Sequence, residues 1–201
     1  MDLFVATRNS GKLIELRDIL RPLNINVRTY DEFPHIKPVA ETGTTFEQNA
    51  VLKASQTAKQ TNLITLADDS GLEVDCLAGQ PGVYSARFAG QNATDSMNNE
   101  KLLDLMDGVP LGSRQARFVC AIAIASPDKV IGTVTGVCEG HIALEPDGSG
   151  GFGYDPLFVA SGYNYTFAQL SSEIKNKISH RGKALNKAFI LLEKLVLSEP
   201  G

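Results

Sequence analysis

The N-terminal half of the chain alternates between short apolar runs and stretches with helical spacing. The apolar run at residues 2–6 predicts a strand, and Leu13, Leu16 and Leu20 recur at the spacing of a helix over residues 12–20. A second strand near residues 25–29 completes a β-α-β start. After a loop at residues 31–43, Thr44 and Glu47 form a capping-box pattern, which predicts a helix that runs to about residue 60.

The C-terminal half mixes strands, turns and helices. Further strands are expected at residues 63–67 and 73–77, then a turn-rich loop at 78–92 and a helix that Thr94 caps and that runs to about residue 106. Alternating runs at 114–125 and 129–143 predict an antiparallel hairpin. A glycine-dense loop follows at 148–153, and Ser179 introduces a final helix through about residue 197. The interleaved elements predict an α/β fold with a mixed sheet.

The composition is that of an ordinary globular protein. Of the 201 residues, 43% are hydrophobic and 21% are charged, which argues against disorder and favours one domain over residues 1–201 that can have two lobes. The net charge is −4 and no run of Lys or Arg occurs, so the electrostatic footprint of a DNA or RNA binder is missing. We therefore expect no nucleic-acid partner, whereas a small anionic ligand needs only a few local cations.

The cysteines and the apolar runs narrow the class of protein further. Cys76, Cys120 and Cys138 are widely spaced without a CxxC pair, so neither a disulfide framework nor a zinc site is indicated, and all three are expected to be core thiols. The longest strongly apolar run, residues 119–125, is too short to span a membrane. The N-terminus lacks the basic stretch of a signal peptide. We expect a cytoplasmic protein without a membrane partner.

The turn between the first strand and the first helix is a candidate phosphate site. Free backbone N–H groups and the helix dipole favour an anion at such a junction. A cation in the first helical turn opposes the dipole, so Lys12 makes sense beside an anion, although it could also be a solvated surface lysine. The spacing is not that of a Walker A loop. The residues of the turn are Thr7, Arg8, Asn9, Ser10, Gly11 and Lys12.

Lys53 is a second cation with an unusual place in the pattern. It falls on the same helical face as Phe46, Ala50 and Thr57, which is the apolar face of the predicted helix. Either its side chain passes the edge of the helix into solvent, or it points into a polar cleft together with Asn49.

Asp68 and Asp69 follow the apolar run 63–67, at the expected C-terminal end of a strand, where open α/β sheets place ligands. Adjacent carboxylates repel each other unless a cation lies between them or one is protonated. Mg²⁺ needs only one or two carboxylates when phosphate oxygens and water complete its shell. The alternative is a turn pair, because Asp-Asp-Ser-Gly is good turn chemistry. Glu41 is a third candidate carboxylate.

The glycine-dense loop is a candidate base site. Glycines let the backbone approach a ligand closely, and Phe152 would offer a flat face for stacking. The alternative is that these residues form only a flexible hairpin loop. His180 and Arg181 again place cations in the first turn of a helix. Together with Asp155 they would supply the donors and acceptors that read the edge of a base.

Taken together, these segments resemble the inosine triphosphate pyrophosphatase family, also described as dITP/XTP pyrophosphatases. The resemblance is carried, in order along the chain, by ATRNSGK (6–12), ETGTTFEQNAVLKA (41–54), LADDSGLEVDCLAGQPGVYSARFAG (66–90), QARF (115–118), GGFGYDPLF (150–158) and SHRGKAL (179–185). It covers residues 6 to 185.

The resemblance implies a role for each matching position. Residues 7–12 would bind the triphosphate, with Asn9 and Lys12 on phosphate and Lys53 assisting. Asp69 would be the proton acceptor and a Mg²⁺ ligand, Asp68 its catalytic neighbour, Glu41 the second metal ligand, and Ser70 a substrate contact. The base and ribose pocket would comprise Phe152, Gly153, Tyr154, Asp155, Lys175, His180 and Arg181, with Phe152 stacking. Arg8 departs from the small or polar residue usual in the family, which leaves its role open.

The family also implies an elongated mixed sheet with flanking helices in two lobes, with the nucleotide in the cleft, and a homodimer. The expected reaction is hydrolysis of ITP, dITP or XTP to the monophosphate and pyrophosphate, by attack of water on the α-phosphorus. Two other interpretations stay open: a pyrophosphatase for modified pyrimidine nucleotides, against which the base-end motifs argue, and a nucleotide sensor without turnover, against which the three carboxylates argue.

Overall fold

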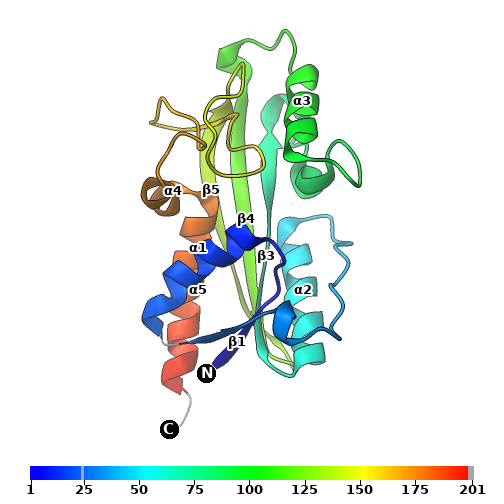
Figure 1. Cartoon of the computed structure of the whole chain (residues 1–201), viewed down its shortest axis with the longest axis vertical. Coiled ribbons are helices and arrows are strands. Elements are labelled where there is room, and N and C mark those ends of the chain that lie inside the picture. Colours follow the sequence, from blue (N-terminus) through cyan, green and yellow to red (C-terminus); the bar gives the residue numbers. More distant parts are fainter. Residues whose placement is uncertain (24, 199–201) are drawn as a thin grey trace. The chain divides into compact units, whose positions relative to one another are not determined.

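The computed structural model describes residues 1–23 and 25–198. Its helices are α1 (Ser10–Leu20), α2 (Phe46–Thr61), α3 (Asp95–Leu105), α4 (Ser172–Ile178) and α5 (His180–Ser198). Its strands are β1 (Asp2–Val5), β2 (Asn26–Arg28), β3 (Ile64–Val74), β4 (Gln115–Ala125), β5 (Val130–Ile142) and β6 (Phe158–Ala160). Short 3-10 turns connect several of these elements (Figure 1).

The six strands form one mixed sheet in the order β2-β1-β3-β4-β5-β6. β1 pairs in parallel with both β2 and β3, whereas β5 and β6 are antiparallel. β4 and β5 are neighbours, and the turn between them is closed by a hydrogen bond from Ser126 N to Lys129 O of 2.9 Å. The predicted α/β class, the mixed sheet and the β4–β5 hairpin are confirmed.

The chain divides into two compact units, which are described separately. The first unit comprises Met1–Asp69, Cys120–Gly136 and the chain from Arg181 onward. In it, α1 and α5 lie on one side of the strands and α2 on the other (Figure 1). The apolar core between the α1–α5 pair and the strands includes Leu16, Leu66, Ile122 and Leu185.

The second unit comprises Ser70–Val119 and Val137–His180. Its core joins β3 and β4 residues to α3 and to the segment after β5. The large apolar side chains in this core are Leu72, Phe88, Leu102, Met106, Phe118, Leu157, Phe158 and Phe167. Within the described residues, no helix is long and apolar enough to cross a membrane.

Arg114 lies in the second unit, is only 3% exposed, and uses its guanidinium to satisfy backbone carbonyls. The acceptors, at 2.9 to 3.3 Å, are the carbonyl oxygens of Ile142, Met106, Val109 and Ala143. Two of these acceptors lie just after α3 and two at the end of β5. One buried cation therefore ties the C-terminal end of α3 to the end of β5, and burial lowers the pKa of this guanidinium.

We expect Arg114→Met to lower the free energy of unfolding by about 3–5 kcal/mol, because each buried carbonyl left without a donor costs about 1–3 kcal/mol. Urea unfolding measures the loss. Arg117→Met is the matched control, since Arg117 has a 40% exposed side chain in an ion pair with Glu73 and should cost no more than about 1 kcal/mol. Equal losses in the two variants would show that the buried carbonyl contacts of Arg114 stabilise the fold no more than a surface ion pair does.

Three sequence predictions about local structure are wrong. Helix α2 is capped by Thr45, whose hydroxyl accepts from Gln48 N at 3.1 Å, instead of by Thr44 with Glu47. The side chain of Gln48, not that of Glu47, reaches back along the chain, and its amide oxygen accepts from Thr44 N at 2.9 Å. Cys76 is exposed, because it lies in a short turn beyond the end of β3, whereas Cys120 and Cys138 are buried as predicted.

The third error concerns the residues between the two predicted strands. β3 runs without a break from Ile64 to Val74, so Asp68 and Asp69 lie inside a strand, not at its end. Residues 75–77 form a 3-10 turn instead of strand. The turn chemistry of Asp-Asp-Ser-Gly is overridden because buried residues on both sides, Leu66 and Leu72, hold the strand in the sheet.

Candidate active site

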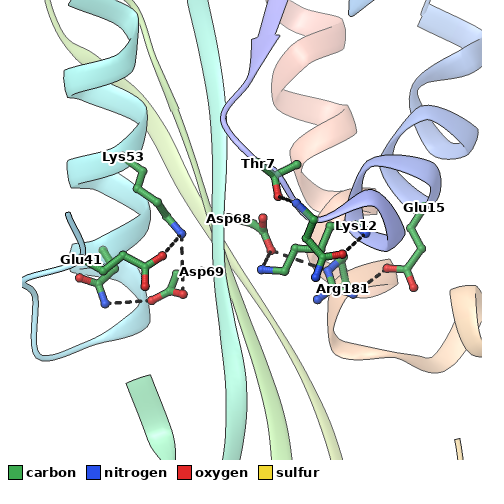
Figure 2. Close-up of polar contacts among 10 residues, drawn as sticks. Thr7, Lys12, Glu15, Glu41, Lys53, Asp68, Asp69 and Arg181 are labelled. Carbon is green, nitrogen blue, oxygen red and sulfur yellow. Dashed lines mark hydrogen bonds and ion pairs between the residues drawn. The ribbon is translucent and has the colours of Figure 1, made fainter. Parts of the chain in front are cut away.

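Asp68 and Asp69 point to opposite faces of β3, as successive residues of a strand must. Figure 2 shows Asp68 directed toward Lys12 and Arg181, and Asp69 directed toward Lys53 and Glu41. Both carboxylates are 6% exposed. The sequence offered two ways to relieve the repulsion, a cation between the carboxylates or protonation of one of them, whereas in the structure each carboxylate has its own cation on its own face.

The Asp68 face brings two cations to one carboxylate. Lys12 Nζ lies 2.8 Å from Asp68 Oδ2, and Arg181 Nε lies 3.7 Å from the same oxygen. Arg181 Nη1 also contacts Glu15 Oε2 at 2.7 Å. Burial alone would raise the pKa of Asp68, but Lys12 and Arg181 outweigh it and hold the pKa well below its usual range. Asp68 is therefore a permanent anion that holds these cations in place.

The Asp69 face is built from α2 and the loop before it. Asn49 Nδ2 donates to Asp69 Oδ2 at 2.9 Å, and Lys53 Nζ lies 2.7 Å from Glu41 Oε1 and 3.8 Å from Asp69 Oδ1. Lys53 thus points into a polar cluster, which settles the alternatives left open by the sequence. Burial raises the pKa of Asp69, and the negative charge of Glu41 adds to the rise, while Lys53 and Asn49 oppose it; the net shift is upward.

The turn before α1 has the geometry of a helix N-terminus. Asn9 is the N-cap, and its side-chain oxygen accepts from Lys12 N at 3.1 Å. Thr7 Oγ1 accepts from Asn9 N at 3.2 Å, and Ser10 and Gly11 open the helix. The Arg8 guanidinium lies 5.1 Å from the centre of the Tyr30 ring. Lys12 is not the solvated lysine of the alternative interpretation, because it pairs with Asp68.

The glycine-dense loop lies in the second unit beside α4. Lys175 Nζ contacts Asp155 Oδ2 at 2.6 Å, and the same oxygen accepts from Phe152 N at 2.8 Å. The Lys175 ammonium lies 5.0 Å from the centre of the Phe152 ring. Gly151 has a φ of +75°, and a side chain there would collide with the Asp155 carboxylate, so this tight turn requires glycine.

Two further predicted residues of the second unit are fixed by aromatic packing and a backbone contact. The ring of His180 stacks on Phe118 at 4.6 Å between centroids and an angle of 11°. Tyr154 is buried and its hydroxyl donates to Ser85 O at 2.8 Å, and burial raises the pKa of this phenol.

A family model described as the Ham1 family matches residues 3–190 of the chain. The chain belongs to the Ham1 family. The match includes β3, the turn before α1 and the glycine-dense loop, so every cluster described above lies within the matched residues.

Relatives and solved structures agree with this assignment. A relative from Desulforamulus reducens, named dITP/XTP pyrophosphatase, is 53% identical over 199 residues, covering 99% of each chain. One from Bacillus subtilis with the same name is 48% identical over 94% of this chain and 96% of the relative. The Ham1 protein of Staphylococcus aureus has a TM-score of 0.87 at 41% identity and covers 97% of this chain and 100% of its own. The resemblance found in the sequence is confirmed.

In this Ham1 chain, two carboxylates around Lys53 could contribute ligands to a bound Mg²⁺. Carboxylate oxygens are preferred Mg²⁺ ligands, and Glu41 and Asp69 reach the same ammonium from two different segments. A cation already lies where the two carboxylates converge, so this pair fits a metal whose remaining ligands are phosphate oxygens and water. Within the described residues, no group of three or more His, Cys, Asp or Glu side chains is arranged to hold a metal by itself.

The predicted base-end residues are divided between the two units of the Ham1 fold. Phe152, Asp155 and Lys175 lie together in the second unit, where His180 also lies. Arg181 belongs to the first unit, and its guanidinium contacts Glu15 and Asp68. The predicted Asp155–His180–Arg181 group is therefore not a single cluster within one unit.

Two residues of these clusters escaped the sequence analysis. Glu15 follows Lys12 by one helical turn on α1, and this spacing, which places both on one face, was a usable signal. Phe118 lies in the QARF segment and stacks on His180, but its pairing across 62 positions in the chain left no local signal. Helix α4, which carries Lys175, was also not predicted, because its seven residues are too short for a periodic pattern.

Proposed function

We propose that this Ham1 protein hydrolyses deaminated purine nucleoside triphosphates (ITP, dITP and XTP) to the monophosphate and pyrophosphate. The observation that carries the proposal is the 53% identity, over nearly the whole of both chains, to a relative named dITP/XTP pyrophosphatase. The arrangement of cations and carboxylates on the two faces of β3 supports the reaction type, because it provides both a base and counter-charges for phosphates.

In the proposed reaction, a water oxygen forms a bond to the α-phosphorus and the bond to the leaving pyrophosphate oxygen breaks. Asp69 orients this water and takes its proton, a role for which an upward-shifted pKa makes a carboxylate better suited. Asn49, which donates to Asp69 Oδ2, fixes the plane of the carboxylate. Lys12 and Lys53 offset the charge that develops on the pyrophosphate.

Asp68 has a different part in this proposal. It is held ionised by Lys12 and Arg181, so it is not the group that takes up the proton. Its charge keeps both cations oriented at the end of β1 before the triphosphate binds. The resemblance already distinguished Asp69, as proton acceptor, from Asp68, as its catalytic neighbour, and the position of the two side chains on opposite faces of β3 supports this division.

We further propose Mg²⁺ as the cofactor, with Glu41 and Asp69 as its protein ligands. When bound, the metal neutralises charge on the phosphate oxygens. Lys53 contacts both of these carboxylates in the structure, which supports their convergence on one cationic ligand.

Selectivity for the base is proposed to rest on stacking and on hydrogen-bond donors. Phe152 offers its ring for stacking, and the proposed donors to the O6 of hypoxanthine are His180 and Arg181. Adenine carries a donor at that position, so ATP would leave buried donors unpaired, at a cost of about 1–3 kcal/mol for each group. The remaining proposed contacts to the substrate come from the turn before α1, from β3 and from the glycine-dense loop. These residues are Thr7, Arg8, Ser10, Gly11, Ser70, Gly153 and Tyr154.

We expect pyrophosphate release from ITP and XTP to exceed release from ATP and dUTP, and to stop when EDTA removes the metal. The measurement is a pyrophosphate assay on ITP, XTP, GTP, ATP and dUTP, each with Mg²⁺ and with EDTA. Preference for dUTP would favour the pyrimidine alternative. Binding of ITP without any release would favour the sensor alternative, and full activity in EDTA would contradict the metal proposal.

We also propose a homodimer, on the ground of the resemblance, and a cytoplasmic location, on the ground that the sequence lacks the pattern of a signal peptide. Light scattering on the purified protein should give twice the mass of one chain.

A further inference from the structure

Helix α3 carries two side chains that contact opposite sides of one residue in the glycine-dense loop. Asp95 Oδ2 accepts from Gly153 N at 2.6 Å, and Asn99 Nδ2 donates to Gly153 O at 3.0 Å. The four-residue spacing places both side chains on one face of the helix. Both groups of the Gly153 backbone are thereby satisfied by side chains of a single element.

The residue types match what Gly153 requires. A carboxylate only accepts, which suits the N–H of Gly153, and an amide nitrogen donates, which suits its carbonyl. Asp95 is the first residue of α3, where a negative charge is favoured by the helix dipole. Both contacts are therefore compatible with the helix that bears them.

Asn99 is held in this orientation at an energetic cost. The side chain is 8% exposed, and its Oδ1 has no hydrogen-bond partner among the described residues. Turning the amide over would place Oδ1 against the Gly153 carbonyl and lose the bond. A buried acceptor without a partner is rare and calls for an explanation, and the bond to Gly153 supplies one.

The helix that holds Gly153 is itself fixed in the second unit. Leu102 and Met106 are fully buried in the core, and Asn98 Oδ1 accepts from Ala89 N at 2.8 Å. Lys101 Nζ donates to Phe88 O at 2.6 Å. α3 is thus anchored in the second unit by contacts that do not involve the glycine-dense loop.

Gly153 directly follows Phe152 and has a φ of +63°, a conformation that few residues adopt. The N–H of Gly153 belongs to the peptide that joins it to Phe152, and its C=O belongs to the next peptide. The two contacts therefore fix both peptides that flank Gly153, the first of which carries Phe152. We propose that Asp95 and Asn99 are positioning residues, which hold Gly153 so that Phe152 is set for stacking on the base. This inference rests on the proposed function, because the base is what Phe152 is proposed to contact.

The first test compares the steady-state kinetics of Asp95→Ala, Asn99→Ala and the double variant with ITP and Mg²⁺. We expect KM to rise by about tenfold in the double variant while kcat stays within about twofold, because stacking on the base holds the substrate and is not part of the chemical step. Asp95→Asn keeps an acceptor for Gly153 N and should recover most of the wild-type KM.

Asp104→Ala is the matched control. It removes the same charge from an exposed position on the same helix, and KM should not change. An equal rise in KM for Asp104→Ala would show that the effect belongs to the charge of α3 in general, and would overturn the proposal.

A double-mutant cycle with Phe152→Ala shows whether the pair acts through the ring. If it does, Asp95→Ala should raise KM far less in the Phe152→Ala background than in the wild type. Additive effects would overturn the proposed route through Phe152.

Amide hydrogen exchange tests the contact without relying on turnover. The Gly153 amide should exchange faster in Asp95→Ala than in wild type or Asp104→Ala, and unchanged exchange would overturn the proposal. If the wild-type protein releases no pyrophosphate from any nucleotide, the proposed function fails, and this exchange measurement still decides whether Asp95 holds the loop.

Discussion

Asp69→Asn is expected to lower kcat for pyrophosphate release from ITP by about 10²–10⁴-fold, the usual contribution of a general base. The substitution keeps the size of the side chain and removes the proton acceptor. Asp69 is the carboxylate with the upward-shifted pKa, and it lies between the amide of Asn49 and the ammonium of Lys53.

The measurement is kcat at saturating ITP and Mg²⁺, together with the Kd for ITP from equilibrium binding. Binding should stay within a few-fold of wild type, since Lys12 and the turn before α1 are untouched. Asp75→Asn, the same substitution just beyond the end of β3 on a 59% exposed side chain, is the control and should be fully active. An active Asp69→Asn would remove Asp69 from the mechanism.

Asp68→Asn is expected to lower the free energy of unfolding by about 3–5 kcal/mol, because it leaves buried cations without their anion. Lys12 and Arg181 both contact the Asp68 carboxylate, and their side chains are only 18% and 5% exposed. The loss in the free energy of unfolding is limited because Arg181 keeps its contact with Glu15. Urea unfolding at neutral pH measures the difference from wild type.

The pH dependence of this difference has a definite sign. The pKa of Asp68 is lowered in the folded state, so below neutral pH the unfolded state takes up the proton first. The advantage of wild type over Asp68→Asn should be complete above about pH 5 and should shrink as the pH falls through the unfolded-state pKa of about 3.9. A difference that grows on acidification would contradict the assignment of Asp68 as a permanent anion.

The matched control is Asp18→Asn on α1. Asp18 pairs with Arg21 at 3.0 Å, but the two side chains are 51% and 81% exposed. Such surface pairs contribute about 0–1 kcal/mol, so this variant should unfold like wild type. The two substitutions together separate the effect of burial from that of losing one negative charge.

Local pattern was sufficient for most of the elements, although not for α4 or for the unbroken β3, and it was sufficient for the identity of the family. The spacing of Leu13, Leu16 and Leu20 predicted α1, and Thr94 was predicted and found as the cap of α3. Strands β4 and β5 were predicted because apolar and polar residues alternate over a long run in each. The motifs at residues 6–12, 66–90 and 150–158 led to the family that the comparisons confirm.

The tertiary structure decided what each charged residue contacts. Asp68 and Asp69 are neighbours in the chain, and the sequence placed them at the end of a strand. In the sheet, β3 continues through both residues, and successive side chains of a strand point to opposite faces. Asp68 therefore contacts Lys12 and Arg181, whereas Asp69 contacts Asn49 and Lys53. Contacts such as Asp68–Arg181 and Asp95–Gly153 join residues far apart in the chain, and only the folded chain brings them together.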